Sequence, residues 1–520
     1  MNFTRILARA LRLNLSHVKG KRHITLASRS KIPFTTGQPT HETRPHYLPV
    51  PGHITPGIPA LDYYERRLKL AKELPLKSVA VLVGNQIQFA LGSVFYEFQQ
   101  DNDLYYMTGW LEPESVALIE NTGEEVYLHM LVPNKDPHAE LWEGHRTGTE
   151  GAYDFFNADY VENINKLDTY IADIIERNDN VFFDETKFKN GKHQKSILKN
   201  FFGTINGTEP STHATIQQLL KKTNKNVRGL TNIIAKLRLV KSDNEINVMH
   251  AVGQISSRAI NKAIAQVGSE TPLMTEKSLA KYLEYQFVRG GCDKQAYIPV
   301  VASGPNSLTI HYTRNDDLLY RDELVFVDAG GKLGGYCSDI SRTWPNSPQG
   351  FNEPQRDVYD IVLATNKACI DLCSEDQSVS LNDIHEKSVT ELWKGLSSLP
   401  GFDNVSKSDV SRHLYPHYIG HHLGLDLHDV PSVSRFQKLV TGNVITIEPG
   451  LYIPENDKWP KWYHGIGVRV EDDVVVSKTK SGILNLTSGC VKEVEDIEAL
   501  IRQGKCTTPG IENELVLLDI

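Results

Sequence analysis

Four carboxylates lie within or at the ends of apolar stretches, where an ionised side chain carries a free-energy cost. Asp328 ends a predicted strand over 323–328 and shares a face with two apolar residues of that strand. Asp339 follows eleven residues later, across a Gly-rich connection, and a hairpin of this length could bring it beside Asp328. Glu448 ends another apolar strand, and Glu471 interrupts a run of valines.

Buried carboxylates can be accommodated in three ways: by protonation, by pairing with cationic side chains or by binding metal ions. Arg342 and Arg469 are the basic residues nearest in the sequence, and they could offset two of the four charges. Two divalent ions would balance all four, and oxygen-rich ligation favours a hard ion such as manganese. Taken singly, these residues leave the three possibilities open.

An imidazole-dense loop over 420–429 offers a nitrogen ligand to such a site. It contains His421, His422 and His428, and Pro431 follows it. Adjacent side chains of an extended chain point in opposite directions, so only one of His421 and His422 should be a ligand. The spacing alone does not choose between them.

The elements that must position these residues form a second, larger body of the chain. The apolar periodicity predicts helices at about 243–267 and 274–289, and two more helices between about 353 and 398. Strands fill the intervals and dominate the end of the chain.

A smaller α/β body precedes it, and we expect the boundary near residue 235. A strand over Ser78–Val83 and a helix that includes Leu61 and Ala71 open this first body. Six prolines lie in the preceding stretch, 38–60. Because proline lacks a backbone donor and resists helix, this stretch is predicted to be an extended arm, with the folded body starting after it.

The N-terminal segment carries eight basic residues before its first acidic one, Glu42. Arg5, Arg9 and Arg12 recur at helical spacing, and apolar side chains occupy another arc of the same predicted helix. A short basic amphipathic helix is typical of a mitochondrial presequence. A secretory signal is disfavoured, because the arginines interrupt every apolar run.

The composition of the 520 residues is that of an ordinary globular protein, with 40% hydrophobic and 23% charged residues. The formal net charge of -8 argues against nucleic-acid binding, which depends on a basic surface. No uninterrupted apolar stretch reaches the roughly 18 residues of a membrane-spanning helix.

These motifs resemble those of the aminopeptidase P branch of the pita-bread metallopeptidases, and within it the fungal mitochondrial intermediate cleaving peptidases. The resemblance covers about residues 37–500. It rests on GQPTHETRP (37–45), TPGIPALDYYERR (55–67), FQQDNDLYYMTGWLEP (98–113), YIPVVASG (297–304), HYTRN (311–315), VDAG (327–330), SDISRT (338–343), GHHLGLDLHD (420–429), IEPGLY (447–452) and VRVEDD (468–473).

The resemblance implies an α/β N-terminal domain followed by an α+β pita-bread catalytic domain. With the N-terminal segment included, the expected organisation has four parts. They are a presequence and processing region (1–41), an aminopeptidase P-type N-terminal domain with its Pro-rich arm (42–235), the catalytic domain (236–505) and a tail (506–520).

The resemblance also implies a site with two divalent ions, for which Mn²⁺ is the expected metal. It assigns the imidazole ligand to His421 and leaves His422 as a non-ligand. Arg469 is expected to orient Glu471. By motif, the metal ligands are Asp328, Asp339, His421, Glu448 and Glu471, the catalytic residues are His311, His428 and Glu448, and the substrate-binding residues are Tyr297, His311, His428 and Arg469.

The expected function is that of a metallo-aminopeptidase that removes a single N-terminal residue from imported mitochondrial proteins after presequence cleavage, on the matrix side. Its expected partners are peptides or proteins with free N-termini, and not nucleic acids. The first alternative is a mitochondrial Xaa-Pro aminopeptidase, and a distant one is a non-catalytic peptide-binding module. Peripheral association with the inner membrane and a homo-oligomer are left open.

Overall fold

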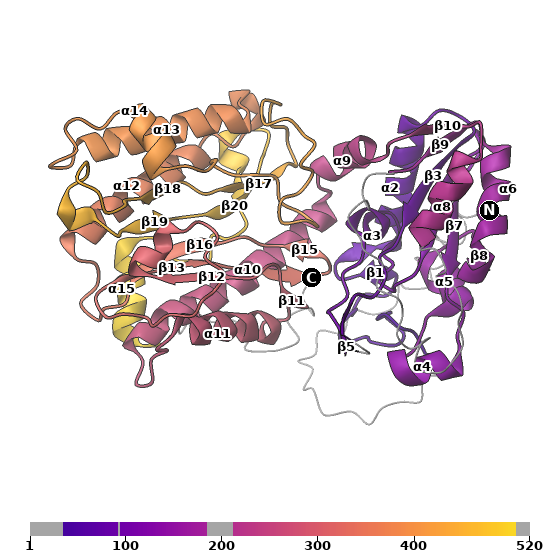
Figure 1. The fold of residues 1–520 in the computed structure, drawn as a ribbon, viewed down its shortest axis with the longest axis horizontal. Coiled ribbons are helices and arrows are strands. Elements are labelled where there is room, and N and C mark those ends of the chain that lie inside the picture. The colour runs from indigo at the N-terminus through magenta and orange to yellow at the C-terminus, as the bar shows by residue number, and fades with distance from the viewer. Residues whose placement is uncertain (1–34, 92–93, 185–211, 506–520) are drawn as a thin grey trace. The chain divides into compact units, whose positions relative to one another are not determined.

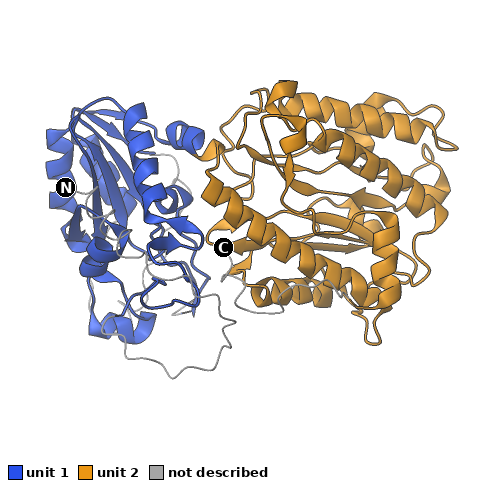
Figure 2. Ribbon diagram, turned by 180° about the vertical axis from the view of Figure 1, so that it is seen from behind, with its two compact units in different colours: residues 1–237 blue, residues 238–520 orange. Residues whose placement is uncertain are grey.

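The computed structural model describes residues 35–91, 94–184 and 212–505. Residues 1–34 of the predicted presequence region and the predicted tail, 506–520, lie outside these ranges. The chain divides into two compact units, residues 1–237 and 238–520 (Figure 2). Among the described helices, none combines the length and the apolar composition that spanning a bilayer requires.

A six-stranded mixed sheet forms the centre of the first unit, in the order β10-β9-β3-β6-β7-β8 (Figure 1). The predicted strand Ser78–Val83 is β3, and all six of its residues are buried, as in a strand covered on both faces. β3 is antiparallel to β6 and parallel to β9. The other strands of this sheet are β6 (Val116–Asn121), β7 (Val126–Val132), β8 (Tyr160–Asn163), β9 (Asn180–Phe182) and β10 (Asn226–Arg228).

Helices α6 (Leu167–Arg177) and α8 (Thr212–Lys221) pack against this sheet. Apolar residues of α6 recur at the spacing of one helical face, from Leu167 through Ile171 to Ile175, and they bury against the valines of β3. The predicted helix around Leu61 is α2. The remaining elements of the unit are α2 (Ala60–Glu73), α3 (Asn102–Thr108), α4 (Pro137–Glu143), α5 (Gly148–Phe156), β4 (Phe89–Leu91) and β5 (Val94–Phe95), and α9 (Thr231–Leu239) crosses the unit boundary.

The Pro-rich stretch does not precede the folded body, and that prediction was wrong. It includes the small hairpin of β1 (His53–Thr55) and β2 (Ile58–Pro59). Gln38 is buried; its Nε2 donates to the Gly109 carbonyl at 2.9 Å, and its Oε1 accepts from the Leu111 amide at 2.6 Å. The prolines prevent helix, but the backbone and side chains of this stretch still find partners within the first unit.

The second unit places short strands between two layers of helices (Figure 1). Helices α10 (Asp243–Ala265) and α11 (Glu276–Arg289) lie on one side, and α12 (Glu353–Ile370) and α13 (Leu381–Ser397) lie on the other. These four helices match the four predicted from apolar periodicity. A capping box between Ser242 and Glu245 starts α10. The arrangement is the α+β pita-bread fold.

The strands of the second unit form several small antiparallel sheets. One joins β12, β13 and β16, a second joins β11, β14 and β15, a third joins β17, β20 and β21, and β18 pairs with β19. Their bounds are β11 (Lys294–Gln295), β12 (Val300–Ser303), β13 (Leu324–Asp328), β14 (Gly331–Leu333), β15 (Tyr336–Cys337), β16 (Ser341–Pro345), β17 (Val444–Ile447), β18 (Gly450–Tyr452), β19 (Gly467–Arg469), β20 (Asp472–Val475) and β21 (Leu484–Asn485), with helices α14 (Lys407–Asp409) and α15 (Val494–Gln503).

Candidate active site

Asp328 and Asp339 meet where β13 ends. Asp328 is the last residue of β13 and pairs with Ser341, the first residue of β16. Asp339 lies just before β16, in the gap after β15, so the chain is outside both strands at the acid. The hydroxyl of Tyr297 contacts one carboxylate oxygen of each aspartate, both at 2.5 Å. The hairpin thus brings the two acids together, as its length predicts.

Glu448 lies in the gap between β17 and β18, and Glu471 lies in the facing gap between β19 and β20. Ile447 of β17 pairs with Asp472 of β20, and Gly450 of β18 pairs with Arg469 of β19. The two glutamates lie between these pairs and outside both ladders. The valine run that Glu471 interrupts therefore forms two strands, because the chain leaves the ladder before the acid and re-enters it directly afterwards.

The histidine loop runs beside β17. The amide of Thr446 donates to the carbonyl of His421, and the amide of Glu448 donates to the carbonyl of Ile419. Nδ1 of His421 lies 3.0 Å from the carbonyl oxygen of His422, which can only accept, so Nδ1 carries the proton. Nε2 of His421 is then the nitrogen left to bind a metal, and it faces Asp339 at 3.5 Å and Glu448 at 3.8 Å.

A metal ion fits this group of side chains. One ligand atom from each of Asp339, His421 and Glu471 lies within 4.8 Å of the other two. Asp328 and Glu448 border the same group through Tyr297 and His421. Carboxylate oxygens with one imidazole form a donor set for hard divalent cations. The structure therefore brings the five predicted ligands close together, and the three side chains that could share one ion include His421 and not His422.

The pKa values also indicate uncompensated negative charge. Burial raises the pKa of Asp328 to about 7, although Arg469 opposes the change. Burial and the neighbouring carboxylates raise the pKa of Glu471 well above its ordinary value. Burial disfavours the charged form of His421, but the hydrogen bond to Asp339 and the charge of Glu448 outweigh it and raise the pKa to about 9. A bound cation would relieve this repulsion.

Arg469 is buried and donates to three groups of the site. It pairs with Asp328, and it donates from Nε to the Ser341 hydroxyl at 2.9 Å and from Nη1 to the Tyr452 hydroxyl at 2.9 Å. Ser341 in turn donates to Glu471 at 2.6 Å. Arg469 therefore orients Asp328 directly and Glu471 through Ser341, which is the orienting role that the resemblance implies.

Arg342 is not part of this cluster, and the idea that it offsets a site charge is wrong. Its guanidinium is fully buried and pairs with Asp472 at 2.8 Å, beside the strand break that holds Glu471. It also donates to the carbonyl oxygens of Ser341, Glu471, Cys490 and Val491. Arg342 is three positions from Asp339, and side chains an odd number of positions apart on an extended chain point to opposite faces. The partners of Arg342 therefore lie on the face turned away from the carboxylates.

His311 and His428 are both exposed. We call the side of the carboxylate cluster that they border its open side. The ring of His428 meets the ring of His421 edge-on, with centroids 4.4 Å apart. His311 contributes to lowering the pKa of His428, although burial contributes more. Both imidazoles can therefore contact a molecule that approaches the carboxylates.

His417 is the main site residue that the sequence reasoning missed. Its Nε2 lies 2.9 Å from the Tyr452 hydroxyl, and its Nδ1 lies 3.7 Å from Glu448. Burial lowers the pKa of His417 to about 3, which keeps the ring neutral. The sequence signal for His417 is its position four residues before the predicted ligand His421.

Ser341, the first residue of β16, is also a site residue that the sequence reasoning missed. Its sequence signal is its position two residues after the predicted ligand Asp339.

Comparisons with known proteins agree with this arrangement. Residues 63–182 match the model of the aminopeptidase P N-terminal domain, and residues 247–478 match that of metallopeptidase family M24. The chain is 48% identical to intermediate cleaving peptidase 55 of Saccharomyces cerevisiae over 93% of this chain and 92% of that protein. It is 34% identical to human Xaa-Pro aminopeptidase 3 over 90% of each.

Solved structures give the same picture. A crystal structure of the Saccharomyces cerevisiae peptidase that lacks 58 N-terminal residues matches with a TM-score of 0.77 and 46% identity, covering 87% of this chain and 100% of that one. Aminopeptidase P of Escherichia coli in its low-pH form matches with a TM-score of 0.76 and 28% identity, covering 86% of this chain and 99% of that one.

Proposed function

The chain belongs to metallopeptidase family M24, and on that basis we propose that it removes a single N-terminal residue from imported mitochondrial proteins after their presequences have been cleaved. The observation that carries this proposal is the 48% identity, over nearly the whole of both chains, to a peptidase named for cleaving intermediates. A related plant protein of the same name, 34% identical, is described as mitochondrial. We place the reaction on the matrix side, where imported proteins lose their presequences.

The chain is a metallo-aminopeptidase, and five side chains would hold two divalent ions: Asp328, Asp339, His421, Glu448 and Glu471. We propose Mn²⁺ as the metal, because four of the five groups are oxygen ligands. When bound, such ions supply Lewis acidity at the scissile carbonyl and make water a stronger acid. The free α-amine of a peptide would dock at this cluster, which accounts for action at N-termini.

The protein's own groups move and hold the protons. Glu448, at the open edge of the cluster, accepts a proton from the attacking water and delivers it to the leaving amine. His428 and His311 donate hydrogen bonds to the tetrahedral oxygen and to the substrate backbone. Tyr297 and Arg469 hold Asp328, and Nδ1 of His417 lies 3.7 Å from Glu448.

A mitochondrial Xaa-Pro aminopeptidase is the second candidate, because relatives with that name are 34–36% identical to this chain. The two candidates differ in whether the residue after the scissile bond must be proline. A non-catalytic peptide-binding module does not fit the intact ligand set. An Xaa-Pro enzyme and an intermediate cleaving enzyme would share every residue named above.

The test compares two peptides with the full chain loaded with Mn²⁺, one beginning Tyr-Ala-Ser and the other Arg-Pro-Pro. Release of tyrosine from the first supports processing of presequence intermediates. Cleavage of the second alone would make the chain an Xaa-Pro aminopeptidase, and cleavage of neither would reject both. The Glu448→Gln variant controls for a contaminating peptidase. In cells that lack the gene, precursor N-termini should keep the extra residue.

A further inference from the structure

A buried amide lies between the two segments that carry Glu448 and Glu471. Asn366, on α12, is fully buried, and its Nδ2 donates to the carbonyl oxygen of Ile447 at 3.0 Å and to that of Val470 at 3.1 Å. Ile447 directly precedes Glu448, and Val470 directly precedes Glu471. Ile447 is the last paired residue of β17, and Val470 lies in the gap between β19 and β20. The amide therefore joins the two segments at the edge of the ladder, beside the backbone bond from the Val470 amide to the Pro449 carbonyl.

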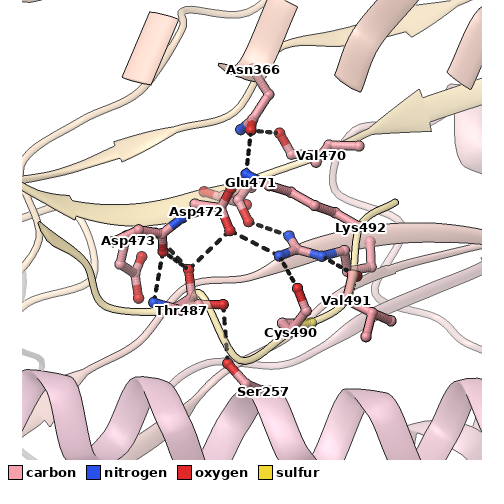
Figure 3. Close-up of polar contacts among 12 residues, drawn as sticks. Ser257, Asn366, Val470, Glu471, Asp472, Asp473, Thr487, Cys490, Val491 and Lys492 are labelled. Carbon is pink, nitrogen blue, oxygen red and sulfur yellow. Dashed lines mark hydrogen bonds and ion pairs between the residues drawn. The ribbon is translucent and has the colours of Figure 1, made fainter. Parts of the chain in front are cut away.

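Lys492 determines which way this amide faces. Its Nζ donates to Oδ1 of Asn366 at 2.9 Å and to Asp472 at 2.6 Å (Figure 3). An ammonium group has no acceptor, so only the amide oxygen can face it, and Nδ2 must then face the two carbonyl oxygens. In the reverse orientation, Oδ1 of Asn366 would face the carbonyl oxygens of Ile447 and Val470, and its Nδ2 would face the ammonium group of Lys492.

The same network continues to the backbone of Glu471. Asp472 accepts from Lys492 and from Arg342, and Arg342 also donates to the carbonyl oxygens of Glu471 and Ser341. Every group in this chain of contacts has a partner, so the network is rigid rather than loosely packed. None of these side chains touches the open side of the carboxylate cluster.

We propose that Asn366 is a positioning residue that sets the spacing between Glu448 and Glu471, and that Lys492 acts by holding the Asn366 amide in its working orientation. Glu448 and Glu471 are ligands in the proposed function, so the roles given to them rest on that function. Supporting residues of this kind change metal affinity or activity by about 10- to 100-fold when removed. A displacement of about 0.5 Å between ligands is enough to matter.

Asn261 provides a matched control. It is a buried asparagine on α10, its Nδ2 donates to the Gly489 carbonyl at 2.8 Å, and its Oδ1 accepts from the Val491 amide at 3.1 Å. It therefore fixes the same C-terminal segment that carries Lys492. Its amide bonds to no residue that flanks a predicted ligand, so its loss should affect stability without changing the ligand spacing.

The experiment compares Asn366→Leu with Asn261→Leu in the full chain, because leucine is close to asparagine in size and has no polar side-chain atoms. The first readout is the visible absorption spectrum of the protein titrated with Co²⁺, which reports ligand geometry without needing activity. The second is kcat and KM with Mn²⁺ on the peptide that the wild type cleaves. The third is the Tm of each variant.

Asn366→Leu should alter the Co²⁺ spectrum and lower kcat by about 10- to 100-fold, with KM changed by less than about threefold. Asn261→Leu should lower the Tm and leave the spectrum and kcat close to wild type. A wild-type Co²⁺ spectrum in Asn366→Leu, or equal effects of the two substitutions, would overturn the proposal.

Lys492→Met keeps the proposal testable if Asn366→Leu does not fold. Lys492→Met leaves the side-chain amide of Asn366 in place but removes the donor that fixes its orientation. Lys492→Arg restores a donor at the same place. Loss of kcat and an altered spectrum in Lys492→Met, recovered in Lys492→Arg, would support the proposal, whereas no change in Lys492→Met would overturn it. If the wild type cleaves no peptide, the proposed function fails, and the Co²⁺ spectra still decide the positioning role.

Discussion

His421 presents Nε2 to Asp339 at 3.5 Å because its Nδ1 is held by the backbone carbonyl of the next residue. The ring cannot rotate without losing that hydrogen bond, so Nε2 stays directed at the carboxylates. His422, its neighbour, has its backbone paired beside β17, and its Nδ1 has no partner among the described residues. Two adjacent histidines therefore have different capacities to bind metal.

His421→Ala should lower the metal content of the protein and reduce kcat/KM by more than about 100-fold, because it removes a nitrogen ligand from the cluster. Metal content is measured by mass spectrometry after exhaustive dialysis, alongside circular dichroism. His422→Ala is the control and should keep the wild-type metal content per folded molecule. Equal metal loss in both variants would contradict the assignment of His421.

Glu448→Gln should lower kcat by about 1,000-fold, because an amide of the same shape cannot carry the proton from water to the leaving amine. KM should change by less than about threefold if the peptide is held mainly by the other groups. Steady-state kinetics with the preferred peptide provide the measurement. A variant with more than about a tenth of wild-type kcat would show that another group carries the proton.

Removal of metal should destabilise the second unit, because it leaves four buried carboxylates facing one another. At a metal concentration 100-fold above Kd, binding stabilises a folded protein by about 2.7 kcal/mol. This corresponds to a rise in Tm of about 4–5 °C for a unit of this size. Thermal scans with EDTA and with added Mn²⁺ test the expectation, and coincident curves would argue against a metal that binds only the folded state.

The first unit should lose stability in acid through Glu120. Burial alone would raise the pKa of Glu120, but hydrogen bonds from His129, Arg177 and Asn178 outweigh it and lower the pKa to about 2. Because the folded pKa is below the unfolded one, this stabilisation is fully present above about pH 4.5 and is lost as the pH falls toward 2. Arg177 is half exposed and solvent screens the pair, so we expect on the order of 1–2 kcal/mol at neutral pH.

Glu120→Gln should therefore have a lower Tm than wild type at pH 7, and the difference should shrink as the pH is lowered from 5 to 3. Glu162→Gln, which removes an ion pair with the exposed Lys166, is the control and should change Tm by little at either pH. A Glu120→Gln deficit that persists unchanged at pH 3 would contradict the charge argument.

Much of the site could be predicted from residue types. Strand periodicity placed Asp328 and Glu448 at strand ends, and apolar spacing predicted α10 to α13. The length of the Gly-rich connection predicted that Asp339 would lie beside Asp328. In each case the information lies within a few residues of the position itself, where period and turn chemistry act directly.

The strand breaks and the network behind the site could not be predicted in the same way. The valine-rich residues around Glu471 have the pattern of a single strand, because periodicity does not show where a strand stops pairing with its neighbour. The acidic partner of Arg342, Asp472, and the partner of Asn366, Ile447, lie more than 80 positions away in the sequence. Such contacts depend on the packing of α12 against the strands, and the local pattern carries no record of it.

Gln38→Ala should loosen the N-terminal stretch of the first unit. The substitution removes the bonds to the Gly109 carbonyl and the Leu111 amide and leaves both groups without that partner. We expect a loss of about 2 kcal/mol. Limited proteolysis should show faster cleavage between residues 38 and 60, while cleavage of the exposed α4 stays unchanged. Unaltered protection of the stretch would contradict this role of Gln38.

The buried stretch around Gln38 also affects whether another copy of the enzyme could remove residues from the N-terminus of this chain. An aminopeptidase acts on a chain end that is free to extend into its site. Residues from Thr36 onward are fixed by hydrogen bonds among Thr36, Thr40 and Thr43 and by the contacts of Gln38. Removal of residues by another copy of the enzyme should therefore stall at this segment.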